Sequence, residues 1–415
     1  MQYLTPSFTK DMLKDYTILI PNMAPLQLRI VKAAMESEGY HVELLQNSGS
    51  QVARLGLQYV HNDTCYPALL IIGQFLDALN SGKYDLHHTA LVITQSGGGC
   101  RASNYIKLLR KALVKAGYSY IPVASVNPKG LEKGSTMPVT LRLLRKLLAA
   151  VEYGDLLDAL RNQIRPYEKE QGSADRWVDR WINTITQWMN NNKNYAIRTM
   201  PSHFQEIAHS ATTVPIVKTN KIKVGIVGEI YVKFSPMGNN DLKHFLEEEG
   251  CEVNMPGIMG YLQYCTANCE KTIELYGGSH IMHKVWHIAS HILDDLGQAA
   301  STAAKENGFY GPGSFTDLMK GAEEVIHLGA KMGEGWLLSG EMIELIKGGY
   351  KNIICAQPFG CLPNHIMGKG VINKLCSLYP DANITPIDYD PGASHVNQEN
   401  RIKLMLAEAK RSASS

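Results

Sequence analysis

Short apolar runs alternate with helical patterns from residue 16 to residue 126, and this alternation is the feature that most restricts the possible folds. The strand-like runs lie at 16–22, 41–46, 89–95 and 120–126. The helical patterns lie at about 27–39, 65–79 and 104–117. Strands that are separated by helices of this length usually pair in parallel, so the pattern predicts an open, doubly wound α/β sheet.

A second unit of the same kind begins at 221–234, where VGIVGEI is strand-like. It continues with a predicted helix at 239–250 and predicted strands at 251–257, 352–357 and 384–390, followed by a C-terminal helix. Between the units, from Met137 to about Met200, apolar residues recur with a period near 3.6 and predict helices. We therefore expect two doubly wound, Rossmann-like or flavodoxin-like α/β units joined by a helical connection, with domains at 1–135, 136–215 and 216–415.

The charge balance and the hydropathy pattern exclude some classes of partner. Lys and Arg number 41 against 39 Asp and Glu, which argues against nucleic acid or an anionic membrane as the main partner. The N-terminal residues lack the profile of a secretory signal, and no apolar run reaches the ~18 residues of a membrane span. The sequence predicts a cytoplasmic protein that binds neither nucleic acid nor a membrane.

Eight cysteines are present, and three of them occupy a distinctive setting. Cys65, Cys100 and Cys361 are placed where predicted parallel strands end, and ligands bind beyond the carboxyl ends of strands in such sheets. The residues that bend the chain beside them are Pro67, Gly97 to Gly99, Gly360 and Pro363. The cytoplasm keeps thiols reduced, which argues against disulfides, and no CxxC pair is present. Three thiols from separate loops favour an iron–sulfur cluster over a single catalytic cysteine.

The other five cysteines give weaker signals. Cys251 and Cys376 lie in apolar segments where packing is a sufficient role. Cys265 and Cys269 are one helical turn apart, which suits joint ligation and core packing equally. Cys355 lies in a strand-like segment six residues before Cys361, so the sequence allows either a packing role in the core or a role as a metal ligand.

Three further motifs contain residue types found in binding or catalytic sites. The stretch TQSGGGC lacks the lysine of a P-loop, so it does not predict a phosphate cradle. Four histidines share one helical face and can bind metal, namely His280, His283, His287 and His291. No carboxylate accompanies them at a recognised zinc spacing, which favours a polar stripe or a subunit contact. In GEGWLLSGE, Glu334 and Glu341 can act as paired carboxylates, but a helix start anchored by Trp336 is the more ordinary interpretation.

Several motifs in order resemble one known family. They are YVHNDTCYPALLIIGQ, TQSGGGCRASNY, VGEIYVKFSPMGNN, GEGWLLSGEM, QPFGCLPNHIMGKG and IDYDPGASHVNQENRIKLM. Together they are similar to the 2-hydroxyacyl-CoA dehydratase superfamily. More narrowly, they resemble the dehydratase-like region of acyl-CoA dehydratase activase-related proteins, and the resemblance runs from about Tyr16 to Met405. The helical middle of the chain is its least distinctive part.

The resemblance implies a cofactor and its ligands. Members hold a 4Fe-4S cluster on three cysteines in a cleft between α/β domains, which leaves one iron open. The matching positions in this chain are Cys65, Cys100 and Cys361. Related double-cubane proteins hold a cluster of about eight irons and need more thiols, for which Cys265 and Cys355 are the additional candidates.

The resemblance also implies a function. A separate ATP-hydrolysing iron–sulfur activase would donate an electron, and the cluster would reduce a small molecule or an acyl-CoA thioester; a homodimer is expected. His61 and His365, each four residues from a proposed ligand, are candidate proton or hydrogen-bond donors. Arg101 can offset cluster charge or serve only as a surface residue. The alternatives are a non-catalytic electron carrier or cluster scaffold, and a CoA-binding protein with packed cysteines and no cluster.

Overall fold

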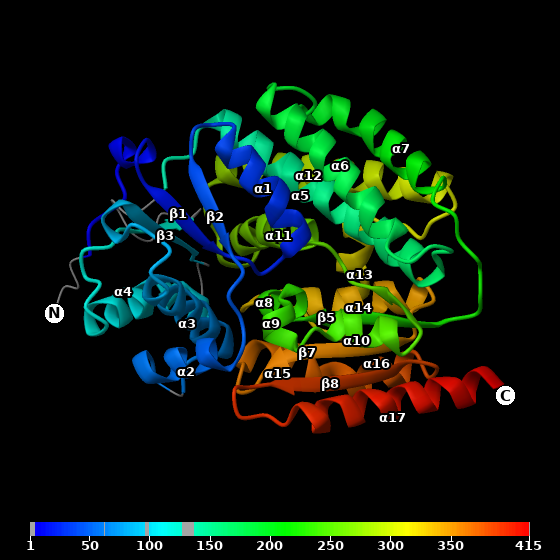
Figure 1. Cartoon of the computed structure of the whole chain (residues 1–415). Helices are drawn as coiled ribbons and strands as arrows, with labels where there is room; N and C mark the ends of the chain where they lie inside the picture. Colours follow the sequence, from blue (N-terminus) through cyan, green and yellow to red (C-terminus); the bar gives the residue numbers. More distant parts are fainter. Residues whose placement is uncertain (1–4, 62, 96–98, 127–136, 415) are drawn as a thin grey trace.

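The fold consists of two parallel four-stranded sheets with helices on their faces (Figure 1). The computed structural model describes residues 5–61, 63–95, 99–126 and 137–414. The first sheet has the order β2-β1-β3-β4, with β1 at Thr17–Pro21, β2 at His41–Leu45, β3 at Thr89–Thr94 and β4 at Val123–Val126. The second has the order β6-β5-β7-β8, with β5 at Ile222–Gly228, β6 at Cys251–Asn254, β7 at Asn352–Pro358 and β8 at Asn383–Tyr389. The predicted doubly wound α/β class is confirmed.

Both faces of the first sheet are covered, which explains why its strands are nearly continuous apolar runs. Ile18 and Val92 belong to a buried cluster on the face that α1 covers. The neighbouring Leu19 and Leu91 belong to the cluster that contains α3 and α4, as the two-residue period of a strand requires. The helices of this unit are α1 (Pro25–Glu36), α2 (Ser50–Tyr59), α3 (Tyr66–Asn80) and α4 (Tyr105–Lys115).

The second unit repeats the strand order of the first, with more helices. They are α8 (Ile230–Phe234), α9 (Pro236–Asn239), α10 (Leu242–Glu248), α13 (Phe315–Val325), α14 (Leu337–Lys347), α15 (Leu362–Met367), α16 (Ile372–Leu378) and α17 (His395–Ser414). The strand-like pattern of VGIVGEI extends too far, because β5 ends at Gly228. Glu229 then caps α8, accepting a hydrogen bond of 2.8 Å from the backbone N–H of Val232.

A helical layer completes the molecule, drawn in green and yellow at the upper right of Figure 1. It contains α5 (Leu141–Ile164), α6 (Ser173–Asn190), α7 (Met200–Ala211), α11 (Ile258–Tyr276) and α12 (His280–Glu306). Trp177 and Trp181 each donate an indole N–H to Oγ of Ser210, at 2.9 and 2.7 Å, which joins α6 to α7. None of the described helices combines the length and apolar character that crossing a membrane requires.

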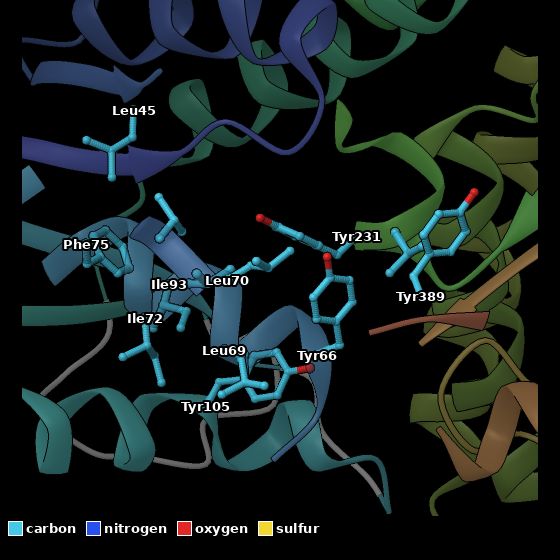
Figure 2. Close-up of a cluster of buried hydrophobic side chains, with 14 of the residues drawn as sticks. Leu45, Tyr66, Leu69, Leu70, Ile72, Phe75, Ile93, Tyr105, Tyr231 and Tyr389 are labelled. Carbon is cyan, nitrogen blue, oxygen red and sulfur yellow. The ribbon is translucent and has the colours of Figure 1, made fainter. Parts of the chain in front are cut away.

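The two sheets share one buried apolar cluster, part of which is drawn in Figure 2. It runs from α3 and α4 into the strands of the second sheet and α17. Tyr66, from the start of α3, lies near Tyr231 and Tyr389 of the second unit, and its phenol contributes to the raised pKa of both after burial itself. The hydrophobic core is therefore continuous across the junction between the sheets, where α3 is placed.

Two carboxyl groups on α5, those of Asp155 and Glu152, differ in their hydrogen-bond partners. Asp155 accepts hydrogen bonds from Nε2 of Gln27 at 3.0 Å and from the backbone N–H of Met259 at 2.7 Å. Glu152 is only 3% exposed, and its Oε2 has no hydrogen-bond partner among the described residues. Burial, and then the charge of Asp155, raise the pKa of Glu152 to about 8.

The buried carboxyl of Glu152 should make stability fall as pH rises. Its folded-state pKa is above the ordinary value of 4.5. The loss of folding free energy caused by burying this carboxyl group is therefore small at low pH, and it grows between about pH 4.5 and about pH 8. Glu152→Gln cannot ionise, and we expect it to unfold like the wild type at pH 5 but to be more stable at pH 9 by a few kcal/mol, at ~1.4 kcal/mol per pKa unit. Denaturant unfolding at both pH values measures this. Glu170→Gln, at a side chain that is 78% exposed, is the control and should show no such difference.

Candidate functional site

Two of the three distinctive cysteines occupy matching positions in the two units. In each sheet the strand order reverses beside the first strand, β1 or β5, and the crevice at such a reversal is where open α/β sheets bind ligands. Cys100 follows β3 and precedes the short helix Arg101–Asn104, and Cys361 follows β7 and precedes α15. Cys65 directly precedes α3. All three therefore occupy the capping position of a helix, where backbone N–H groups are free to face a sulfur atom.

The loops that carry these cysteines lie against one another. The charges of Cys361 and Cys100 both contribute to the raised pKa of Cys65, so the three thiols lie in one neighbourhood. A Cβ placed on Gly99 would be 2.5 Å from Sδ of Met332, so the Cys100 loop lies directly against a side chain of the second unit. The predicted flanking residues Gly97 and Gly98 lie outside the described residues.

Burial keeps the three thiols protonated when no metal is bound. It raises the pKa of Cys100 to about 11 and that of Cys361 to about 12, and it raises the pKa of Cys65 further still. Carboxylates add to the effect: Glu229 acts on all three thiols, and Glu334 acts on Cys100 and Cys361. These thiols therefore do not have the lowered pKa that a cysteine nucleophile needs.

The two carboxylates belong to the second unit and are held by specific donors. Glu334 is 7% exposed; its Oε1 accepts a hydrogen bond from the backbone N–H of Ile230 at 3.2 Å, and its Oε2 accepts one from Nδ2 of Asn364 at 3.0 Å. Burial, and then the charge of Glu334, raise the pKa of Glu229 to about 8. Burial also raises the pKa of Glu334. Acidic groups thus accumulate around the thiols, and the raised pKa values of Glu229 and Glu334 favour their neutral, protonated forms, which limits repulsion of nearby thiolates.

Each thiol also receives hydrogen bonds of the kind that favour its thiolate form. Nδ2 of Asn364 lies 3.5 Å from Sγ of Cys361, and Asn364 also donates its backbone N–H to this sulfur. The backbone N–H groups of Arg101 and Ala102 donate to Cys100. Similarly, the hydroxyl of Tyr105 donates to Cys65.

These residues fit an iron–sulfur cluster by the chemistry of their donor set. Thiolates are the ligands that such clusters use, and N–H groups near the sulfur atoms adjust the reduction potential. The raised pKa values describe thiols that lack a cation, and a metal centre would displace their protons. Cys65, Cys100 and Cys361 would hold the cluster between the two units.

The three other residues predicted for the site, His365, His61 and Arg101, have different surroundings. His365 is fixed beside Cys361: its Nδ1 lies 2.8 Å from the carbonyl oxygen of Cys361, and its Nε2 lies 3.1 Å from Oδ1 of Asp388. His61 is 74% exposed and pairs with Asp63 at 3.3 Å. Arg101 donates a hydrogen bond to the carbonyl oxygen of Asp63, which ties the Cys100 loop to the Cys65 loop. Of the two histidines, only His365 is fixed by contacts beside a proposed ligand.

The remaining cysteines are spread over the second unit and the helical layer. Cys355 is fully buried in β7, against Gly368, and lies near enough to Cys361 for that thiol to raise its pKa, although burial has the larger effect. Cys265 is exposed on α11, and both it and Cys100 raise the pKa of Tyr261, after the larger effect of burial. Cys251 is buried. Cys269 and Cys376 are half-buried.

Two cavities of about 570 Å³ each lie near the junction of the units. The first is lined by charged side chains from α5, α6 and α10, among them Asp158, Arg161 and Lys243. The second lies at the carboxyl ends of β2 and β8, and its lining includes Gln74 and Tyr66, the residue after Cys65. Neither of these two cavities is lined by Cys65, Cys100 or Cys361.

Sequence reasoning missed Glu229, Asn364 and Tyr105 as neighbours of the thiols. A signal was present for Glu229, which follows β5 at the same edge of the sheet where Cys361 follows β7. The positions of Asn364 and Tyr105 beside the thiols depend on how their helices are oriented, which the sequence does not show.

The paired-carboxylate hypothesis for Glu334 and Glu341 is not supported by the contacts. Glu341 pairs with Lys233 at 3.1 Å, while Glu334 accepts hydrogen bonds from other donors. Trp336 anchors the start of α14, donating its indole N–H to Oδ1 of Asn268 at 3.0 Å.

Neither a known protein-family model nor a curated protein sequence matches this chain.

Proposed function

We propose that this chain is the iron–sulfur component of an ATP-dependent, low-potential reductase or dehydratase system. Cys65, Cys100 and Cys361 would hold the cluster. The observation that carries the proposal is the convergence of these three helix-capping thiols from both α/β units, each with hydrogen-bond donors at its sulfur atom. The resemblance of the surrounding motifs to the 2-hydroxyacyl-CoA dehydratase superfamily supports the same assignment.

The protein's own residues would position and shield the cofactor. When bound, an iron–sulfur cluster supplies one-electron redox chemistry. Asn364 and Tyr105 hold the sulfur atoms of Cys361 and Cys65 in place through hydrogen bonds. The apolar cluster around Tyr66 excludes water from one side of the site, which would protect a strong reductant. His365, held between Asp388 and the carbonyl oxygen of Cys361, can present or accept a proton beside the site.

The electron donor and the substrate follow from the family resemblance. A separate ATP-hydrolysing iron–sulfur activase would supply the electron, and a small molecule or an acyl-CoA thioester would accept it. A homodimer in the cytoplasm is the assembly that we propose.

Iron and sulfide counting on anaerobically purified protein tests the proposed ligands. Wild type should contain about four irons per chain for a single cubane, or about eight for a double cubane, with equal sulfide or nearly so. Cys65→Ala, Cys100→Ala and Cys361→Ala should each lose most of this iron, together with the electron paramagnetic resonance signal of the reduced protein. Cys376→Ala, at a half-buried cysteine on α16, is the matched control and should keep both. Unchanged iron in Cys100→Ala would contradict the assignment.

The same preparations test the additional ligands. If the cluster is a double cubane held also by Cys265 and Cys355, alanine at either position should lower the iron content towards that of a single cubane. If both variants keep the wild-type iron content, the three converging thiols suffice. Circular dichroism of Cys355→Ala is needed beside the iron count, because this side chain is also part of the core.

A second candidate function is that of a non-catalytic electron carrier. The same three thiols would serve this function too, because an electron carrier also holds its cluster on cysteine thiolates. The two functions differ in whether an iron has an exchangeable ligand. Adding cyanide to the reduced protein should change its paramagnetic resonance spectrum if an iron is open, and should leave the spectrum unchanged if protein groups ligate every iron.

A further inference from the structure

A second group of ligand-type side chains lies on the hairpin formed by α11 and α12, away from the residues of the thiol site. Glu270 and Glu274 are one turn apart near the end of α11, and His283 and His287 are one turn apart near the start of α12. The two helices pack against each other along this stretch. Their side chains therefore form a ladder in which each carboxylate faces a histidine.

The distances in this ladder converge on one point. Nε2 of His283 lies 3.3 Å from Oε1 of Glu274 and 3.8 Å from Oε1 of Glu270. One ligand atom from each of the three residues lies within 4.8 Å of the other two. A zinc ion bound at ~2.0–2.2 Å by nitrogen and oxygen would hold tetrahedral ligands about 3.3–3.6 Å apart. The observed separations need only small side-chain movements to reach that range.

The neighbouring groups leave the converging atoms available. Lys271 donates to Oε2 of Glu274 at 2.8 Å, so that oxygen is occupied while Oε1 faces His283. Nδ1 of His287 lies 2.8 Å from Oε1 of Glu270, where it can donate to one lone pair and leave the other for a metal. A hydrogen bond from a neighbouring side chain commonly orients a ligating carboxylate in this way. His287 is thus a positioning residue for Glu270.

We propose that Glu270, Glu274 and His283 form a binding site for a divalent transition-metal ion, with Zn²⁺ as the preferred ion. Imidazole and carboxylate ligands together suit zinc better than they suit calcium or magnesium, which take oxygen ligands alone. The side chains of Glu270, Glu274 and His283 are 15, 38 and 32% exposed, so an ion can reach them without opening the fold. Three protein ligands leave at least one coordination position for water or another molecule.

The sequence could show only half of this site. The histidine row on 280–291 lacks a carboxylate at a zinc spacing along its own helix, which favoured a polar stripe. The carboxylates come instead from α11, and the antiparallel packing of the two helices brings them opposite the histidines. The proposed site shares no residue with the thiol site and does not depend on the proposed cluster.

A bound ion would cross-link the two helices where the hairpin is most exposed. On the other side of the first turns of α12, apolar side chains face solvent, namely Ile281 at 75%, Val285 at 47% and Ile288 at 58% exposed. Few buried contacts hold these turns, so the free energy of metal binding would stabilise them locally. Hydrogen exchange of residues 280–288 should slow when Zn²⁺ is added.

Calorimetric titration of the full-length protein with Zn²⁺ tests the site. Wild type, purified anaerobically so that any cluster stays bound, should bind one equivalent at this site. His283→Ala and Glu270→Ala should weaken this binding 10-fold to 100-fold or abolish it. His280→Ala is the matched control, because its imidazole is exposed on the same helix but does not belong to the converging group. All of these positions are at least partly exposed, so the variants should fold, and circular dichroism checks that they do.

Co²⁺ in place of Zn²⁺ identifies the ligand type. Binding at the proposed site should give weak visible bands without a sulfur-to-cobalt charge-transfer band, and His283→Ala should remove them. Equal Zn²⁺ affinity in wild type and His283→Ala would overturn the proposal. So would a sulfur-to-cobalt band that persists in His283→Ala and disappears in Cys65→Ala or in Cys265→Ala, because the ion would then be bound by thiols.

Discussion

Gly73→Ala should lower the free energy of unfolding by ~3 kcal/mol or more, because α2 and α3 cross with their backbones in contact. A Cβ on Gly73 would lie 2.0 Å from the carbonyl oxygen of Val52, and one on Gly56 would lie 2.2 Å from the carbonyl oxygen of Leu69. Both obstacles are backbone atoms, so a side-chain rotation cannot relieve the clash. The helices would have to separate, and α3 is the helix that Cys65 precedes.

Denaturant unfolding of Gly73→Ala and Gly260→Ala forms a matched comparison. Gly260 lies in α11, and a Cβ there would meet no atom within 4 Å. Alanine at this position should be neutral or stabilising by ~0.5–1 kcal/mol, since it restricts the unfolded chain and favours the helix. If Gly73→Ala unfolds at the same denaturant concentration as Gly260→Ala, the close crossing of α2 and α3 is wrong. Gly73→Ala should also reduce iron incorporation, because α3 places Cys65.

Lys233→Met should be the second strongly destabilising substitution. Nζ of Lys233 lies 3.1 and 3.3 Å from the two carboxylate oxygens of Glu341, and the side chains are 5% and 1% exposed. Burial raises the pKa of Glu341 even though the ammonium group opposes this shift. Removing Lys233 would leave a buried carboxylate without its partner, which costs about 3–5 kcal/mol.

The double variant Lys233→Met/Glu341→Leu separates an uncompensated charge from a packing defect. Replacing both partners by apolar side chains of similar volume is often neutral or stabilising, so the double variant should recover most of the stability that the single variant loses. Unfolding free energies of the wild type, both single variants and the double variant give the coupling energy. A double variant as unstable as Lys233→Met alone would mean that the loss comes from packing around Phe234 and not from the charge of Glu341.

The strand pattern was predictable because it depends on local sequence. Both sheets are parallel and are covered by helices, so strands such as 17–21 and 89–94 are continuous apolar runs that stand out from the amphipathic helices. The segment 230–234 is the instructive exception. Its sequence IYVKF has the β-branched and aromatic residues of a strand, yet it forms α8, because β5 ends at Gly228 and Glu229 caps the helix that follows.

Contacts between distant elements were predictable only where the fold has a general rule. The carboxyl ends of parallel strands share one edge of a sheet, and this rule was sufficient to place Cys100 and Cys361 each at the ligand-binding edge of its own sheet. That rule does not specify how the two units pack against each other, so Glu229 and Asn364 were not identified as neighbours of the thiols. The carboxylates opposite the histidine row were missed for a similar reason, because the register between α11 and α12 depends on packing and not on spacing along the chain.

The shared core around α3 has a consequence for how the protein is made. Thirteen of the fifteen residues of α3 are buried, and the apolar cluster that covers them includes strands as late in the chain as β8. During synthesis, the first α/β unit would therefore leave the ribosome with part of this apolar surface uncovered for more than 200 residues of further translation. Chaperone dependence should be greatest in this interval, and a fragment that ends at residue 215 should aggregate when it is expressed alone.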